Sequence, residues 1–211
     1  MTMTKNKKIQ RSPLTIAVLA LLAEEPMHPY RMQQLIKKRG KDEVINVRQR
    51  TSIYQTIERL LRDGLIVVRG TSRETGRPDR TVYEATEEGK ALLLEWLRDM
   101  LSALPQEFPE FPAALSFLGL LRIQEVEQLL EKRTVALKEE LARIDSALQT
   151  AKAAIPRLFM LEMEYKRTVI EAELKWVSCL IGDIRSGDLV WDEEWLREIA
   201  QRFASPNNEP V

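Results

Sequence analysis

Small polar and cationic side chains recur along one side of a short helix that the sequence predicts just before Gly64. At about 100° per residue, five of them share one face: Thr51, Ser52, Gln55, Arg59 and Arg62. Hydroxyl, amide and guanidinium groups of this kind hydrogen-bond the edges of bases and the oxygens of phosphates. Tyr54 lies at the border of this face. The pattern indicates a polyanion-binding surface, although ordinary solvated helices carry the same pattern, so the neighbouring elements must decide.

The opposite face of this helix is apolar and falls within an arc of roughly 100° formed by Ile53, Ile57, Leu60 and Leu61. Gly64 ends the helix, because glycine accepts the left-handed backbone that follows a helix. Apolar segments over residues 65–68 and 81–85 then predict a β-hairpin. Its loop, residues 69–80, carries four arginines against two acids. A recognition helix followed by a hairpin with a basic tip predicts a winged helix-turn-helix.

The formal net charge of zero hides an uneven distribution along the 211 residues. Residues 1–90 carry 18 Lys and Arg and 11 Asp and Glu, whereas residues 91–211 carry 14 and 21. One basic half beside one acidic half is expected when only the first half binds a polyanion.

Further elements complete the predicted fold class, which is mostly α with a small β-wing. Helices are expected over residues 13–23, 29–39 and 86–103, with a short strand over 44–47. The predicted domains are a winged-helix DNA-binding domain over 1–103, a proline-containing extended linker over 104–112, a helical dimerisation domain over 113–204 and a disordered tail over 205–211.

Heptad-like apolar spacing predicts two long helices in the second half, one ending near residue 154 and one over 157–185. The residues expected to mediate dimerisation are Val126, Leu130, Leu137, Leu141, Ile144, Leu148, Leu161, Tyr165 and Trp176. Two such helices cannot bury both seams alone, so we expect a twofold homodimer, with an intramolecular three-helix bundle as the alternative. The single cysteine, Cys179, is expected to be buried and inert, and it excludes an intramolecular disulfide.

Several segments together resemble the PadR family of phenolic-acid-responsive transcriptional regulators. Residues 13–36 are similar to its first two helices, although Pro29 replaces the family's glycine in a His-Gly-Tyr element. The other matching segments are Ser52–Leu60 with Asp63–Ile66 for the recognition helix, Gly76–Pro78 for the wing tip, Tyr83–Gly89 for the end of the wing, and residues 111–183 for the C-terminal helical domain of the longer subgroup.

The resemblance implies a dimeric, usually repressing regulator that binds double-stranded DNA at a pseudo-palindromic operator. Some members release DNA on binding a small aromatic or hydrophobic compound. By position, the resemblance places Tyr30, Ser52, Tyr54 and Gln55 at the DNA, with the wing near Arg77. From residue chemistry the candidates for reading bases are Ser52, Gln55 and Arg59, with Gln55 expected to pair with adenine and Arg59 with guanine or a phosphate. Phosphate contacts are expected from Lys5, Lys7, Lys8, Arg48, Arg50, Arg73, Arg77 and Arg80.

Catalysis finds little support, and we expect neither an enzyme nor a cofactor or metal. The single histidine, His28, lies in a turn beside two prolines, where capping or packing is the expected role. An aromatic effector pocket could be lined by Trp96, Trp176, Trp191, Trp195, Phe108, Phe111 and Phe117, although such residues at helical spacing usually form a core.

The apolar segment over residues 14–23 is too short to span a bilayer, so no membrane partner is expected and the predicted location is cytoplasmic. Two other classes of protein remain as alternatives. A winged-helix protein–protein adaptor would not need the excess of positive charge, and a helical metal-dependent enzyme would need clustered His or carboxylate ligands.

Overall fold

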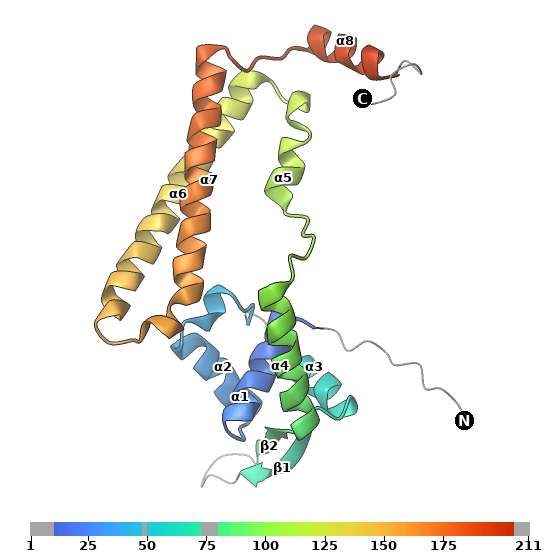
Figure 1. Ribbon diagram of the computed structural model, residues 1–211, viewed down its shortest axis with the longest axis vertical. Helices are drawn as coiled ribbons and strands as arrows, with labels where there is room; N and C mark the ends of the chain where they lie inside the picture. Colours follow the sequence, from blue (N-terminus) through green and yellow to red (C-terminus); the bar gives the residue numbers. More distant parts are fainter. Residues whose placement is uncertain (1–10, 48–49, 73–79, 205–211) are drawn as a thin grey trace. The chain divides into compact units, whose positions relative to one another are not determined.

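The computed structural model describes residues 11–47, 50–72 and 80–204, and the chain divides into two compact units, residues 1–106 and 107–211 (Figure 1). The first unit contains α1 (Pro13–Glu24), α2 (Pro29–Lys38), a 3₁₀ turn (Lys41–Glu43), α3 (Arg50–Arg62), β1 (Ile66–Ser72), β2 (Arg80–Ala85) and α4 (Glu87–Ser102). The second contains α5 (Glu110–Leu115), α6 (Ile123–Lys152), α7 (Leu161–Ser186) and α8 (Glu193–Ala204), with 3₁₀ turns at Leu118–Leu120 and Arg157–Phe159. The predicted fold class is confirmed.

Helix α1 forms the centre of the first unit and contacts α2, α3, α4 and β2. It begins at Pro13, and the Ser12 side chain accepts a hydrogen bond from the Thr15 amide at 3.1 Å. Pro13 suits this position because the first helical residue needs no amide proton. Val18 and Leu19 of α1 are completely buried, so α1 supplies the surface on which the other elements pack.

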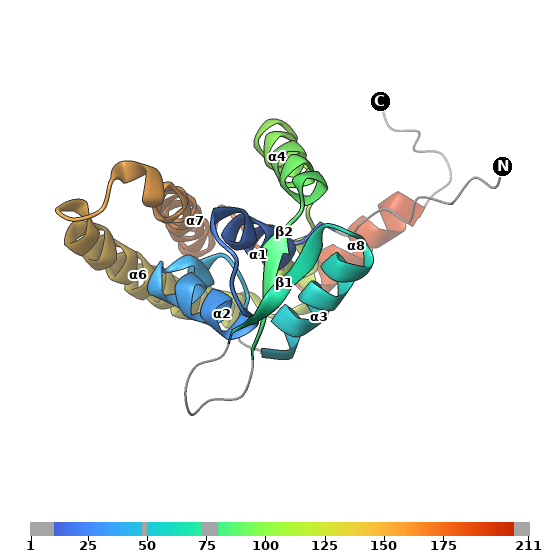
Figure 2. The same ribbon diagram turned by 90° about the horizontal axis from the view of Figure 1, so that it is seen from below.

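Strands β1 and β2 pair antiparallel from Ile66 opposite Ala85 to Ser72 opposite Arg80. Figure 2 shows this hairpin running past α1, with α3 beside β1. Met27, in the turn between α1 and α2, forms an isolated β-bridge with Tyr83 of β2. Each of the two amides donates to the carbonyl of the other residue at 3.0 Å. The hairpin is therefore fixed to the helical part of the unit by backbone hydrogen bonds.

One threonine joins the end of α3 to the start of α4. Gly64 follows α3 with φ 72°, and the Leu65 amide donates to Leu60 O at 2.9 Å. The Thr86 hydroxyl donates to Gly64 O at 3.0 Å and also accepts from the Gly89 amide at 3.0 Å, as the N-cap of α4. The predicted helix stop at Gly64 is confirmed, and it lies against the start of α4.

The strand expected over residues 44–47 does not form. A 3₁₀ turn occupies Lys41–Glu43, and the residues after it are irregular. Val47 is buried, and its carbonyl accepts a hydrogen bond from the Gln33 side chain at 3.3 Å. A strand needs a neighbouring strand to pair with, and residues 44–47 have none among the described residues. The apolar pattern therefore predicted the burial of Val47 correctly but not a strand.

In the second unit, α6 and α7 pack against each other as an antiparallel hairpin (Figure 1). Their core is formed by Val126 and Leu130 of α6 with Val177, Ile181 and Ile184 of α7. Ion pairs join the two helices at Lys166–Glu140 (2.6 Å), Arg167–Asp145 (2.6 Å) and Arg185–Glu127 (2.6 Å). Hydrogen bonds from Arg143 and Lys166 lower the pKa of Glu140 to about 2.

Three expectations for the second unit need correction. Cys179 is exposed, because the buried face of α7 runs through Val177, Ile181 and Ile184. Helix α7 begins at Leu161, since a 3₁₀ turn occupies Arg157–Phe159. Residues 110–112 of the expected linker belong to α5, and Pro112 is tolerated there because it lies in the first turn.

We predict that Gly89→Ala destabilises the protein, since a Cβ at Gly89 would overlap Leu65 O and lie 3.0 Å from the carbonyl carbon. Overpacking of this kind costs roughly 1–3 kcal/mol, measurable as a change in the free energy of unfolding in urea. Gly182→Ala in α7 is the control, because its Cβ would meet nothing within 4 Å and alanine favours a helix by about 1 kcal/mol. Equal stability of the two variants would contradict the close approach at Gly89.

Candidate nucleic-acid interface

Helix α3 buries one face in the first unit and presents the other to solvent. Ile53, Ile57 and Leu60 are at most 2% exposed and join the core with residues of α1 and α2. Tyr54 is 51% exposed, and Gln55 is also exposed. The packing of the apolar side chains therefore leaves a mixed polar and aromatic surface along the outside of α3.

Two further exposed residues give this surface both signs of charge. Arg62 lies at the end of α3 and pairs with Asp63 at 3.0 Å. Glu58 is exposed one turn earlier. Its carboxylate repels a phosphate approaching the middle of α3, whereas the neutral groups nearer the start of the helix do not.

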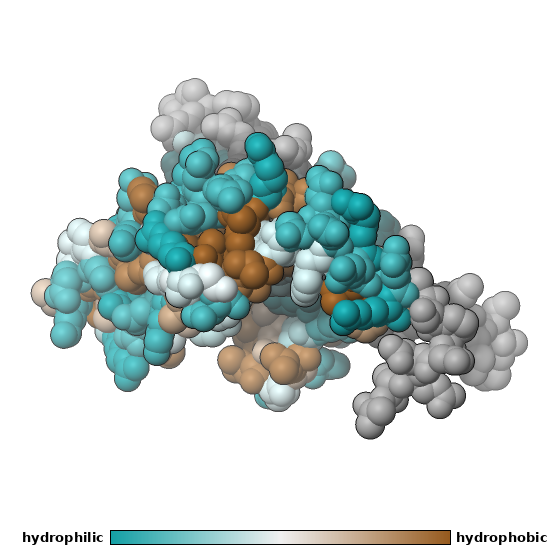
Figure 3. Space-filling view, turned by 90° about the horizontal axis from the view of Figure 1, so that it is seen from above, coloured by the Kyte–Doolittle hydropathy of each residue, from teal (hydrophilic) through white to brown (hydrophobic). Residues whose placement is uncertain are grey.

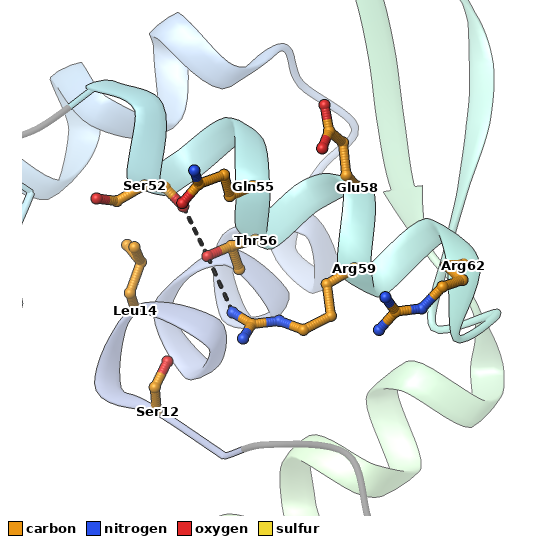
Figure 4. A pocket seen from close by; sticks show the side chains of 8 residues that line it. All are labelled: Ser12, Leu14, Ser52, Gln55, Thr56, Glu58, Arg59 and Arg62. Atoms are coloured by element: carbon orange, nitrogen blue, oxygen red, sulfur yellow. Dashed lines mark hydrogen bonds between the residues drawn. The ribbon is translucent and has the colours of Figure 1, made fainter. Parts of the chain in front are cut away.

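A pocket of about 530 Å³ lies between α3 and the start of α1 (Figure 4). It is lined by Ser12, Leu14, Ser52, Gln55, Thr56, Glu58, Arg59 and Arg62. Inside it, the buried Thr56 hydroxyl donates to Ser52 O at 2.8 Å, and Arg59 Nη2 donates to the same hydroxyl at 3.4 Å. Arg59 Nε is buried without a hydrogen-bond partner among the described residues.

The start of α2 presents a second aromatic group. His28 is the N-cap, and its Nδ1 accepts from the Arg31 amide at 3.4 Å, which agrees with the expected capping role. Its ring stacks on Tyr30 with 6.0 Å between centroids, and Tyr30 is 42% exposed. Arg31 also pairs with Glu25 at 2.5 Å.

A bidentate pair holds the far end of α2 on α1. Both Arg39 guanidinium nitrogens Nη1 and Nη2 donate to the Glu24 carboxylate at 2.7 Å. These hydrogen bonds lower the pKa of Glu24 and raise that of Arg39, so the pair stays charged near neutral pH. It links the C-terminal end of α2 to the end of α1.

The described part of the wing carries one arginine with a side-chain partner. Arg69 of β1 pairs with Glu84 of β2 at 2.8 Å across the hairpin. The pairing is irregular between Val68 and Gly70, next to Arg69. Such an irregularity increases the local twist of a hairpin.

The structure brings together three of the predicted base-reading residues, because Ser52, Gln55 and Arg59 line one pocket. Tyr30 and Tyr54 are exposed on α2 and α3. Arg50 and Arg80 are the first residues of α3 and β2. The remaining predictions, Lys5, Lys7, Lys8, Arg48, Arg73 and Arg77, lie outside the described residues.

Sequence reasoning missed Ser12, Leu14 and Thr56 as neighbours of this surface. The signal for Thr56 was its spacing, since a threonine four residues after another helical residue can bond back to that residue's carbonyl. No local pattern joins Ser12 to α3, because that proximity follows from the packing of α1.

The predicted aromatic residues do not gather into one pocket. Trp96 is buried in the core of the first unit. In the second unit, Phe111 and Trp176 meet edge-to-face with 6.2 Å between centroids, and Arg133 lies 3.6 Å over the Phe111 ring. Trp191 donates to Leu121 O at 2.9 Å. Phe108, Phe117 and Trp195 are exposed.

Within residues 11–47, 50–72 and 80–204, no group of three or more His, Cys, Asp or Glu residues could hold a metal ion. No helix in the described part of the chain is long and apolar enough to cross a membrane.

Part of the first unit matches a known protein family, and the fold is similar to solved structures. Residues 18–95 match the transcriptional regulator PadR-like family. No curated protein matches the sequence. The fold is similar to that of Bacillus subtilis PadR solved in complex with operator DNA, at 20% identity and a TM-score of 0.66, over 82% of this chain and 99% of that one.

Two other solved structures are similar over comparable lengths. Bacillus subtilis PadR in complex with p-coumaric acid matches at 19% identity and a TM-score of 0.64, over 82% of this chain and 98% of that one. The Vibrio cholerae virulence activator AphA matches at 17% identity and a TM-score of 0.62, over the same shares of the two chains. At these identities the likeness establishes the fold, and it extends well beyond the matched domain.

Proposed function

We propose, from the premise that residues 18–95 form a domain of the PadR-like transcriptional regulators, that this protein binds a pseudo-palindromic operator as a homodimer and represses transcription. The observation that carries the proposal is the exposed polar face of α3, which the buried Ile53, Ile57 and Leu60 hold between α1 and the β-hairpin. A recognition helix held in this way enters the major groove of DNA. Such a regulator acts on chromosomal DNA, so we place it in the cytoplasm.

The proposed contacts divide into two groups. Near the start of α3, where a recognition helix reads base edges, Tyr54 and Gln55 are exposed and Ser52 is half-buried at the rim of the pocket. The basic residues Lys7, Lys8, Arg48, Arg50, Arg73, Arg77 and Arg80 supply phosphate contacts from the N-terminal segment, the start of α3 and the wing. Tyr30 joins them from the start of α2. The excess of Lys and Arg over Asp and Glu in residues 1–90 supports the proposed phosphate contacts.

Binding of DNA by this protein should depend steeply on the salt concentration. The purified protein should bind a mixed-sequence duplex, and its affinity should fall steeply with KCl, with a log–log slope of about −0.9 for each phosphate contacted. Fluorescence anisotropy over a series of KCl concentrations measures both quantities. A winged-helix adaptor for proteins would bind no duplex at the lowest salt, and that result would overturn the proposal.

The surface of α7 supports a homodimer. Besides its buried face, α7 exposes a second apolar stripe, on which Leu161, Tyr165, Val169 and Trp176 are 45–73% exposed. Figure 3 shows one face of the molecule, on which hydrophobic residues lie among hydrophilic ones. By contrast, Val126, Leu130 and Ile144 are buried within the protomer, and Leu137, Leu141 and Leu148 are half-buried. The predicted seam of α6 therefore faces its own chain, and we assign dimerisation to the α7 stripe.

Tyr165→Asp should convert the dimer to a monomer, because it places a charge in the middle of the stripe at a residue that is 73% exposed. Light scattering after size-exclusion chromatography measures the mass. Ser178→Asp adds the same charge on another exposed face of α7 and should leave the mass unchanged. A wild-type monomer, or a Tyr165→Asp dimer, would exclude this interface.

We also propose that a flat aromatic acid releases the DNA, as the complex of Bacillus subtilis PadR with p-coumaric acid suggests. Supporting groups are the half-exposed Trp176, its edge-to-face contact with Phe111, and the cationic Arg133 over that ring. p-Coumaric and related acids should quench tryptophan fluorescence and weaken duplex binding, and Trp176→Phe should lose the quenching. Quenching without any change in duplex affinity would contradict effector release.

A further inference from the structure

Arg59 occupies a different position from the other charged residues of α3. It lies about 100° around the helix from Glu58, on the flank that faces the start of α1. The exposed Glu58 also lines the rim of this pocket, so a phosphate has to approach Arg59 from the side of Ser12 and Ser52. Figure 4 shows its side chain running back along α3 towards Thr56, with Ser12 across the pocket. Arg59 is half-buried, so its guanidinium is held beside α3 rather than extended beyond it.

The hydrogen bonding of Arg59 is incomplete. Nη2 donates to the Thr56 hydroxyl at 3.4 Å, and Nε is buried without a partner. Within the described part of the chain, Arg59 has no ion pair, whereas Arg62 and Arg69 pair with Asp63 and Glu84. A buried donor left without an acceptor is costly, more so on a charged group. An anion in the pocket supplies an acceptor for this guanidinium.

We propose that Arg59 binds a phosphodiester oxygen of the DNA backbone in this pocket, and that Thr56 is the positioning residue that holds it there. The proposal rests on the proposed function, because the phosphate belongs to the duplex bound by α3. In a helix-turn-helix the recognition helix, here α3, lies in the major groove with its outer face towards the base edges. Side chains on the flanks of α3 point away from the base edges and towards the walls of the groove, where the backbone phosphates lie. Arg59 is on such a flank, the one beside the start of α1. Of the two contacts expected for Arg59, guanine or a phosphate, this proposal selects the phosphate.

Thr56 is suited to this role because its hydroxyl is a donor to one group and an acceptor from another. It donates to Ser52 O at 2.8 Å, which leaves its lone pairs free to accept from Arg59. Thr56 is 2% exposed, so it reaches no DNA itself. The guanidinium is thereby ordered before DNA arrives, and less conformational entropy is lost on binding.

The test measures binding of the full-length protein to mixed-sequence, A·T-only and G·C-only duplexes over a series of KCl concentrations. Arg59→Ala should weaken binding to all three by about tenfold and reduce the log–log salt slope by about 0.9 per protomer. Arg59→Lys keeps the charge and should keep the slope, with a smaller loss of affinity. Arg98→Ala removes the same charge from α4, outside the pocket, and should change neither.

Base reading and phosphate binding give different results in this experiment. Gln55→Ala should change the ratio of A·T to G·C affinity with the salt slope unaltered, whereas Arg59→Ala should leave that ratio unchanged. A changed ratio in Arg59→Ala, or an unchanged slope, overturns the phosphate assignment. Failure of the wild-type protein to bind any duplex would instead overturn the proposed function.

The positioning role of Thr56 is tested by a double-mutant cycle. Thr56→Val removes the hydroxyl at nearly constant volume and should weaken duplex binding about threefold, while Thr56→Ser should bind as the wild type does. With Arg59→Ala already present, Thr56→Val should have no further effect, because its only route to DNA is through Arg59. Circular dichroism confirms that each variant is folded. Additive losses in the double variant would show that Thr56 acts only on the stability of α3.

Discussion

The reciprocal hydrogen bonds between Met27 and Tyr83, each 3.0 Å long, are the constraint on which the first unit depends. They join the turn between α1 and α2 to the hairpin that follows α3. Because the chain leaves this bridge at Met27 and returns to it at Tyr83, α2 and α3 are enclosed between its two sides. The apolar face of α3 then has one place to pack, and its polar face is left outside. Met27 is itself 2% exposed, so water does not compete for these bonds.

Much of this arrangement was predictable, because it follows from local chemistry. The spacing of Ile53, Ile57 and Leu60 predicted the buried face of α3, and Gly64 predicted its end. Thr86 was predictable as an N-cap from its position before two acids. Each of these signals lies within a few residues of the feature it specifies.

The predictions that were wrong or incomplete depend on partners far along the chain. Residues 44–47 have the apolar composition of a strand, but the pairing partner is absent, so only the burial of Val47 was correct. The heptad spacing of α7 was predictable, yet the face that meets α6 runs through Val177 and Ile181, which exposes Cys179. The pocket beside Arg59 likewise requires Ser12, 47 residues earlier in the sequence. Helical periodicity identifies faces but does not say which neighbour covers each.

The Thr86 hydroxyl has a mechanical consequence for the first unit. It caps α4 by accepting a hydrogen bond from the Gly89 amide. It also donates to the carbonyl of Gly64, two residues after the end of α3. Motion between these helices would break the bond from the Thr86 hydroxyl to Gly64 O, so this side chain couples the two helix ends. A displacement at the start of α4 is therefore passed to the end of α3 through this one hydroxyl.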